Sequence, residues 1–217
     1  MPLVAVVVGW ILGLASPKAV DWLGRADRRE ELIGAIATEL TELRFLVALV
    51  LQQLRSHLRS MDQATLDLIR PILLAPTTDP GDAAHLDATK QLLALGDTAY
   101  IDLHNTGPRS PGRGPLPLPY EAPFLTAHLH ELGIFPIRTR LAVLRIAGEL
   151  RLFNQQVAIV QRAHERSFEQ LSADNHTINT ANLRQGLDSL GVRAVSLIAR
   201  ISEVVGKDGH ALPSHAR

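Results

Sequence analysis

Residues 33–54 read IGAIATELTELRFLVALVLQQL, and this stretch decides the fold. Large apolar residues recur in it at alternating spacings of three and four, namely Ile33, Ile36, Leu40, Leu43, Val47, Val50 and Leu54. That spacing places them along one side of an α-helix, as in a packed bundle or a coiled-coil seam. Between Phe45 and Leu51 apolar residues cover nearly every side, so several neighbouring elements have to bury the helix there. We expect this helix to run from about residue 21 to residue 70, because Pro71 disfavours helical geometry at the residue before it.

An apolar run precedes this helix and is followed by a basic collar. The run extends from Leu3 to Ala15, and the collar contains Lys18, Arg25, Arg28 and Arg29. Such a run covers only roughly 20 Å as a helix, so a membrane span has to continue toward Leu23 to approach the ~30 Å hydrocarbon core. Because no basic residue precedes the run, the positive-inside rule places the N-terminus outside and the body in the cytoplasm.

We therefore predict a single-pass anchor at residues 1–23, in the inner (plasma) membrane of a bacterial cell, with the lipid bilayer as a partner. A re-entrant or peripheral segment, a cleaved signal peptide and a buried core helix are the alternatives; a signal peptide would carry positive charge before its apolar run. Within the run, Ala5, Gly9 and Gly13 recur every four residues and share one helix face. This face predicts close packing of two anchors and hence a homo-oligomer, although glycine is also generally common in membrane helices.

The composition narrows the remaining classes of protein and of site. Lys+Arg and Asp+Glu are equal at 22 each, so no overall field favours nucleic acid as a partner. The chain has no cysteine, which rules out disulfides, thiolate metal sites and cysteine catalysis. Aromatic residues make up 4% of the chain, so the core has to be built from Leu, Val, Ile and Ala. Together with the helical spacing, this predicts an all-α protein.

The middle of the chain differs from both ends. Nine of the thirteen prolines fall within residues 71–123. We expect short helices over residues 83–95 and 98–104, followed by a proline-rich loop over 105–119, because proline cannot donate a backbone hydrogen bond. The loop can be a plain surface connection, a lid, or a docking segment for a proline-binding module. A further short helix is predicted over residues 120–132.

Two long helices are predicted near the C-terminus. The first runs from about residue 136 to 171, and its apolar stripe comprises Leu141, Leu144, Ile146, Leu150, Phe153, Val157, Val160, His164, Phe168 and Leu171. The second begins at Ser172 or Asp174 and ends at Val205, with Gly206 as its cap. We thus predict an N-terminal membrane-anchor helix and a cytoplasmic body, residues 24–206, that forms an antiparallel three- or four-helix bundle with a proline-rich insertion. The tail, residues 207–217, is predicted to be disordered.

Candidate site residues are polar groups on these last two helices. We predict a ligand-binding site or a buried polar network that consists of Asn154, His164, Asn175 and Asn179. Asparagine has a low helix propensity, so its recurrence within predicted helices indicates a structural or functional role. The simpler interpretation is helix capping by Asp174 or Asn175 with exposure of the rest. None of the nine histidines has a glutamate three residues before it, and no nucleotide-binding or nucleophile motif occurs. We therefore predict no catalytic residue, no metal and no cofactor.

These observations favour a non-enzymatic interaction or regulatory module that self-associates at the membrane and binds an unidentified protein partner. The alternative is a small-ligand sensor or enzyme with a polar site between the C-terminal helices. A third possibility, a subunit of a larger envelope complex, predicts an exposed apolar patch over Phe45 to Leu51.

Overall fold

The computed structural model describes residues 2–75, 83–107, 117–169 and 172–206, and of residues 2–27 and 83–86 it describes only the backbone. These residues form helices and no strand, so the all-α prediction is confirmed for them. The elements are α1 (Pro2–Leu58), α2 (Gln63–Leu73), α3 (Ala83–Ala94), α4 (Asp97–Thr106), α5 (Pro123–Ala127), the 3-10 helix η2 (Leu129–Ile134), α6 (Ile137–Arg166) and α7 (Ala173–Val205).

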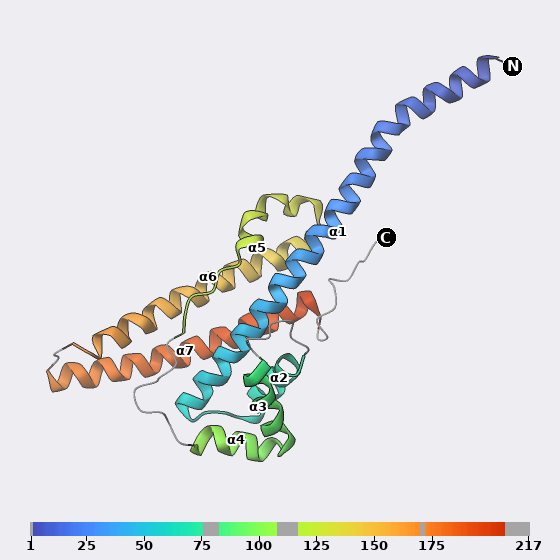
Figure 1. Ribbon diagram of the computed structural model, residues 1–217. Coiled ribbons are helices and arrows are strands. Elements are labelled where there is room, and N and C mark those ends of the chain that lie inside the picture. Colours follow the sequence, from blue (N-terminus) through green and yellow to red (C-terminus); the bar gives the residue numbers. More distant parts are fainter. Residues whose placement is uncertain (1, 76–82, 108–116, 170–171, 207–217) are drawn as a thin grey trace.

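Three long helices make up the body, and α7 packs against both α1 and α6 (Figure 1). It runs antiparallel to α1, because Arg44 of α1 meets Gly206 at the end of α7 while Leu51 lies against Gly191. It is also antiparallel to α6, which precedes it directly in the chain. The segment that contains α5 and η2 lies beside α1 and α6, and the N-terminal part of α1 extends away from the body (Figure 1).

The core follows the predicted stripe on α1 and a row of apolar residues at helical spacing on α7. From Ile36 to Leu54 every α1 stripe residue is buried, and on α7 the stripe from Leu187 to Val204 is buried as well. The apolar segment from Phe45 to Leu51 is covered by its neighbours except at Leu46, so the exposed patch expected of an envelope subunit is not formed there. Burial of these aliphatic side chains is the main stabilising contribution to the bundle.

The predicted stripe on α6 is partly wrong. Val143, Ile146, Leu150, Phe153, Val157 and Val160 are buried against α7. Leu141 and Leu144 instead lie on the opposite, exposed side of the helix. Their spacing of three predicts a shared helix face but does not say whether that face is buried. The next stripe residue, Ile146, follows Leu144 by only two positions, and a shift of two residues in a helix moves a side chain to the other face.

The first helix of the body ends earlier than predicted. α1 stops at Leu58, and Arg59 adopts a left-handed conformation with φ 54°. Asp62 then begins α2, because its side chain accepts a hydrogen bond from the Thr65 amide at 2.7 Å. Pro71 lies inside α2 rather than after a continuous helix. A local cap at Asp62 therefore determined the break, and the proline did not.

Several predictions concern residues outside the described ones. No helix for which side chains are described is long and apolar enough to cross a membrane. The predicted anchor, residues 1–23, with Ala5, Gly9 and Gly13, lies outside that part, although its backbone from Pro2 onward belongs to α1. Most of the proline-rich loop (residues 108–116) and the tail (residues 207–217) are also outside the described residues.

Candidate functional site

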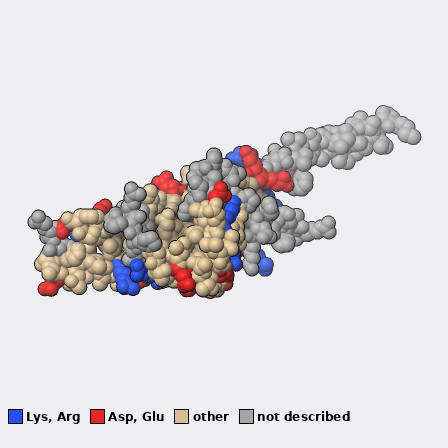
Figure 2. Space-filling model, turned by 60° about the horizontal axis from the view of Figure 1, so that its bottom comes forward, with Lys and Arg blue, Asp and Glu red and all other residues tan. Residues whose placement is uncertain are grey.

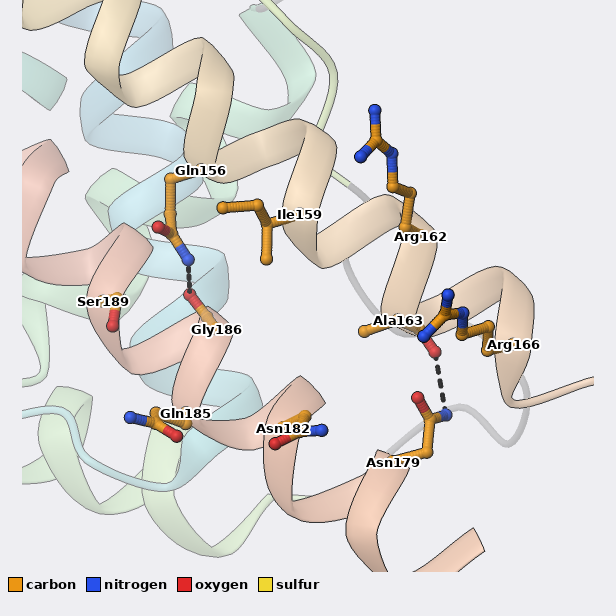
Figure 3. Close-up of a pocket in the computed structure, with 10 residues that line it drawn as sticks. All are labelled: Gln156, Ile159, Arg162, Ala163, Arg166, Asn179, Asn182, Gln185, Gly186 and Ser189. Carbon is orange, nitrogen blue, oxygen red and sulfur yellow. Dashed lines mark hydrogen bonds between the residues drawn. The ribbon is translucent and has the colours of Figure 1, made fainter. Parts of the chain in front are cut away.

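A groove of about 470 Å³ lies between α6 and α7, near the end of the molecule where the two helices connect (Figure 3). Five residues of each helix form its walls: Gln156, Ile159, Arg162, Ala163, Arg166, Asn179, Asn182, Gln185, Gly186 and Ser189. On each helix the wall residues are spaced by three positions or are adjacent pairs, Arg162–Ala163 and Gln185–Gly186. Side chains three positions apart lie on the same side of a helix. The groove therefore runs along the helix pair.

Two hydrogen bonds between the helices hold its walls together. The Asn179 amide donates to the Ala163 carbonyl at 2.9 Å, and the Gln156 amide donates to the Gly186 carbonyl at 3.2 Å (Figure 3). Gly186 also permits the close approach of the helices, because a Cβ at this position would lie 3.1 Å from Cγ2 of Val160. The backbone frame of the groove is thus fixed by side-chain amides and a glycine.

The lining contains cations and neutral polar groups but no carboxylate. α6 contributes Arg162 and Arg166, whereas α7 contributes amides and the Ser189 hydroxyl. Figure 3 shows that the Arg162 guanidinium extends away from α7, while the Arg166 guanidinium extends back toward Ala163. Guanidinium and amide groups donate hydrogen bonds to carboxylates and phosphates, so this arrangement is suited to an anion. Ser189 has no histidine or carboxylate beside it in the lining, so it lacks the base that an acyl-transfer nucleophile needs.

The structure does not bring the four predicted site residues together. Only Asn179 lines the groove, where it is 8% exposed. Asn154 lies farther along α6 and binds the backbone of Tyr120, accepting from its N–H at 3.0 Å and donating to its carbonyl at 2.7 Å. His164 contacts Phe168 edge-on, with ring centroids 5.0 Å apart. Asn175 is exposed.

A side chain does cap the N-terminus of α7, as the capping interpretation predicted, but a different residue supplies it. The N-cap of α7 is Ser172, whose hydroxyl accepts from the Asn175 amide at 3.4 Å; the predicted caps were Asp174 and Asn175. At the other end of α7, Gly206 is the cap with φ 80°, as predicted. The side chain of Asn175 therefore has no assigned part in a site, whereas its backbone belongs to the first turn.

A second polar cluster, which the sequence analysis missed, lies in the core between α1 and α4. The Gln52 amide donates to the Tyr100 hydroxyl at 2.7 Å and lies 3.3 Å from Nε2 of His104. The rings of Tyr100 and His104 stack with centroids 4.2 Å apart. Burial raises the pKa of Tyr100 to about 12, although the hydrogen bond from Gln52 favours the phenolate. Only the spacing of four between Tyr100 and His104 on one helix could have indicated this contact.

Arg44 is a buried cation in the core. It is 3% exposed, and its Nη1 donates to the Gly206 carbonyl at 2.9 Å. Burial lowers its pKa, because a low-dielectric environment disfavours the charged form. The guanidinium lies at the C-terminal end of α7, where the helix dipole favours a positive charge. Arg44 therefore joins α1 to the end of α7.

Within the described residues, no three His, Asp or Glu side chains lie together in a way that could hold a metal ion. No protein-family model, no curated protein and no solved structure matches this chain, so its function has to be argued from its own geometry.

Proposed function

We propose that this protein is a membrane-tethered interaction module without enzymatic activity. In this proposal the N-terminal segment, residues 1–23, holds the helical body at a bilayer and self-associates there, while the body binds a protein partner. The apolar run and the basic collar of the sequence support the tether, and the small residues Ala5, Gly9 and Gly13 support self-association.

The observation that carries the interaction function is an exposed apolar row on the outer side of α6. We call it the outer seam; it consists of Ile137, Leu141, Leu144, Leu152 and Ile159, the last of which also lines the edge of the groove between α6 and α7. These side chains are between 40% and 54% exposed, whereas the row on the opposite side of α6 is buried. Single exposed apolar residues need no explanation, but five that recur on one helix face, with Gly148 and Gln155 between them, are typical of an interaction site.

Light scattering on the full chain in detergent, beside a chain that starts at Asp27, tests the self-association at the membrane. We expect a dimer or larger oligomer of the full chain and a monomer after removal of the N-terminal segment. The double substitution Gly9→Leu and Gly13→Leu should also give a monomer, because leucine prevents the close approach of two helix backbones. Leu3→Ala is a matched control in the same segment and should keep the oligomer.

A monomeric full chain would contradict self-association through the anchor. Persistence of the oligomer in the chain that starts at Asp27 would place the contact in the body instead.

The groove between α6 and α7 supports a second candidate function, the binding of a small anionic ligand. What favours it is a lining that has neutral amides and the Arg162 and Arg166 side chains but no carboxylate, with the Arg166 guanidinium extending toward Ala163 and that of Arg162 extending away from α7. Thermal unfolding in phosphate or citrate, at ionic strength matched with chloride, tests it. A rise of the midpoint that Arg162→Gln and Arg166→Gln together abolish would support binding; an unchanged midpoint would argue against it.

A further inference from the structure

The outer seam has a second regularity besides its exposure. Leu141 and Leu152 are eleven residues apart, as are Gly148 and Ile159, and residues 137, 141, 144, 148, 152, 155 and 159 follow one another at spacings of four, three, four, four, three and four. An eleven-residue repeat keeps an apolar row straight or slightly right-handed along a helix, whereas a seven-residue repeat imposes a left-handed supercoil. The seam is about 33 Å long, which matches a helix of about 22 residues.

Basic residues border this seam on both sides from Arg138 to Arg151. α6 carries six arginines and only two acidic residues, Glu149 and Glu165. At 100° per residue, Arg140 and Arg151 fall on one side of the seam and Arg138 and Arg145 on the other. Arg162 and Arg166 continue its line beyond Ile159. Among the described residues none of these six arginines has an ion-pair partner, and the carboxylate of Glu149 already contacts Arg200 at 3.4 Å.

We propose that the outer seam binds an amphipathic helix of a partner protein that is acidic on both sides of its apolar row. This inference rests on the proposed interaction function and specifies its partner by chemistry. Apolar residues of the partner cover the seam, while its glutamates or aspartates face the bordering arginines, as charged residues do at the edges of coiled-coil seams. Complementary charge selects the partner and its register.

Charge argues against a second copy of this chain as the occupant. Pairing two outer seams, in either direction, places the arginines of one copy against the arginines of the other, and like charges facing each other oppose association. The molecule as a whole carries equal numbers of positive and negative residues, and both signs are interspersed on the face shown in Figure 2. The excess of positive charge is thus a property of α6 and not of the protein in general.

Geometry argues against the bilayer as the occupant. Arg28 of α1 pairs with Glu131 of η2 at 2.9 Å, so the start of α6 lies close to the part of α1 that follows the proposed tether. From there α6 runs away from the N-terminal end of the molecule (Figure 1). A helix with this direction leads away from a membrane that α1 crosses, and its side does not lie flat on the surface.

A designed peptide of about 22 residues tests the inference on the full chain in detergent. The peptide carries leucines at the three-four-four spacing and glutamates on both borders, and a matched peptide has lysines in place of the glutamates. Fluorescence anisotropy should show binding of the glutamate peptide and none of the lysine peptide. The affinity for the glutamate peptide should fall at least about tenfold as salt rises to about 0.5 M. Arg145→Gln with Arg151→Gln should weaken binding and reduce its dependence on salt.

Substitutions locate the binding. Leu141→Ser with Leu144→Ser should reduce the affinity at least about tenfold, because central apolar residues dominate such interfaces. Leu95→Ser with Leu103→Ser is the matched control, since both leucines are exposed but lie outside the seam. Equal binding of the lysine peptide, or no loss with the seam variant, would overturn the inference. So would binding of the chain starting at Asp27 to anionic vesicles that depends on Leu141 and Leu144.

This test is separate from the test of self-association. An oligomer that dissociates without its anchor, in a protein that ignores the acidic peptide, would retain the tether and reject only this partner. Peptide binding by a full chain that is monomeric would instead support this partner and reject self-association through the anchor.

Discussion

Two asparagines of this protein act as clamps on distant backbone, which their sequence context does not reveal. Asn105 accepts from the Met61 N–H and donates to the Met61 carbonyl, both at 2.9 Å. Asn154 does the same with Tyr120. A side-chain amide has both a donor and an acceptor, so it can satisfy the N–H and the carbonyl of one residue at the same time. Each of these backbone groups would otherwise need another hydrogen-bond partner. Asn154 therefore binds the backbone of a loop and lies outside the groove, and it does not join the other predicted site residues.

For the two tyrosine side chains we predict pKa values above the ordinary one. Because burial holds the pKa of Tyr100 at about 12, above its ordinary value of 10.0, the neutral phenol stabilises the fold fully below pH 10.0, and this contribution is lost as the pH rises through about 12. Burial raises the pKa of Tyr120 as well. Ultraviolet absorbance of the phenolate should therefore show no tyrosine titrating with an ordinary pKa in the folded protein.

The chain has two tyrosines, which makes the assignment direct. Tyr120→Phe should leave only Tyr100, titrating at about 12, and Tyr100→Phe should leave only Tyr120, with a pKa above its ordinary value. An ordinary pKa for the tyrosine that is left in Tyr120→Phe would show that Tyr100 is not buried as described.

The helices α5 and α2 are both capped at their N-termini by carboxylate side chains. Glu39 of α1 accepts hydrogen bonds from the backbone amides of Phe124 and Leu125 at 2.8 and 2.7 Å, and so supplies the N-terminal cap that α5 lacks locally. Asp62 supplies a local cap for α2. Local caps of this kind can be recognised in a sequence, whereas a cap donated from more than eighty residues away cannot.

Three helical glycines give a matched series of stability predictions. Alanine favours a helix over glycine by about 0.8–1.0 kcal/mol. Gly148→Ala should show this gain, because its Cβ meets nothing within 4 Å, and Gly191→Ala should show a similar gain because Leu51 lies 4.0 Å away. Gly186→Ala should gain less or destabilise, since its Cβ would lie 3.1 Å from the buried, stiff side chain of Val160.

Chemical denaturation of the three variants measures the series as differences in the free energy of unfolding. The order of the variants is the decisive result. A gain for Gly186→Ala equal to that for Gly148→Ala would mean that α6 and α7 do not approach as closely as described.

The whole molecule depends on α7, which packs against both α1 and α6. Its buried residues recur around much of the helix, with small ones, Gly186, Gly191 and Ala194, among the large aliphatic ones. In contrast α6 buries one side only and leaves the outer seam exposed. Because of this asymmetry, the core of the body surrounds α7, whereas one side of α6 is left uncovered.

The described core begins at Leu32, so we predict that the chain starting at Asp27 keeps the helical body. In the same detergent its midpoint of thermal unfolding, followed by far-ultraviolet circular dichroism, should equal that of the full chain. Leu197→Ala is the positive control, because loss of this fully buried side chain should cost about 2–5 kcal/mol and lower the midpoint visibly. A large fall on truncation alone would contradict the prediction.

The sequence by itself determined the helical class, the buried faces of α1 and α7, and the caps at Ser172 and Gly206 to within a few residues, because these follow from spacing and local chemistry. The break at Asp62 is also encoded locally, by its own side-chain cap, although the apolar pattern alone predicts a continuous helix there. Only the tertiary structure decided that Leu141 and Leu144 face outward, that Asn179 lines a groove while Asn154 holds a loop, and that Gln52 meets Tyr100. The physical reason is that a helical period defines which residues share a face, whereas the packing of other helices decides which face is covered.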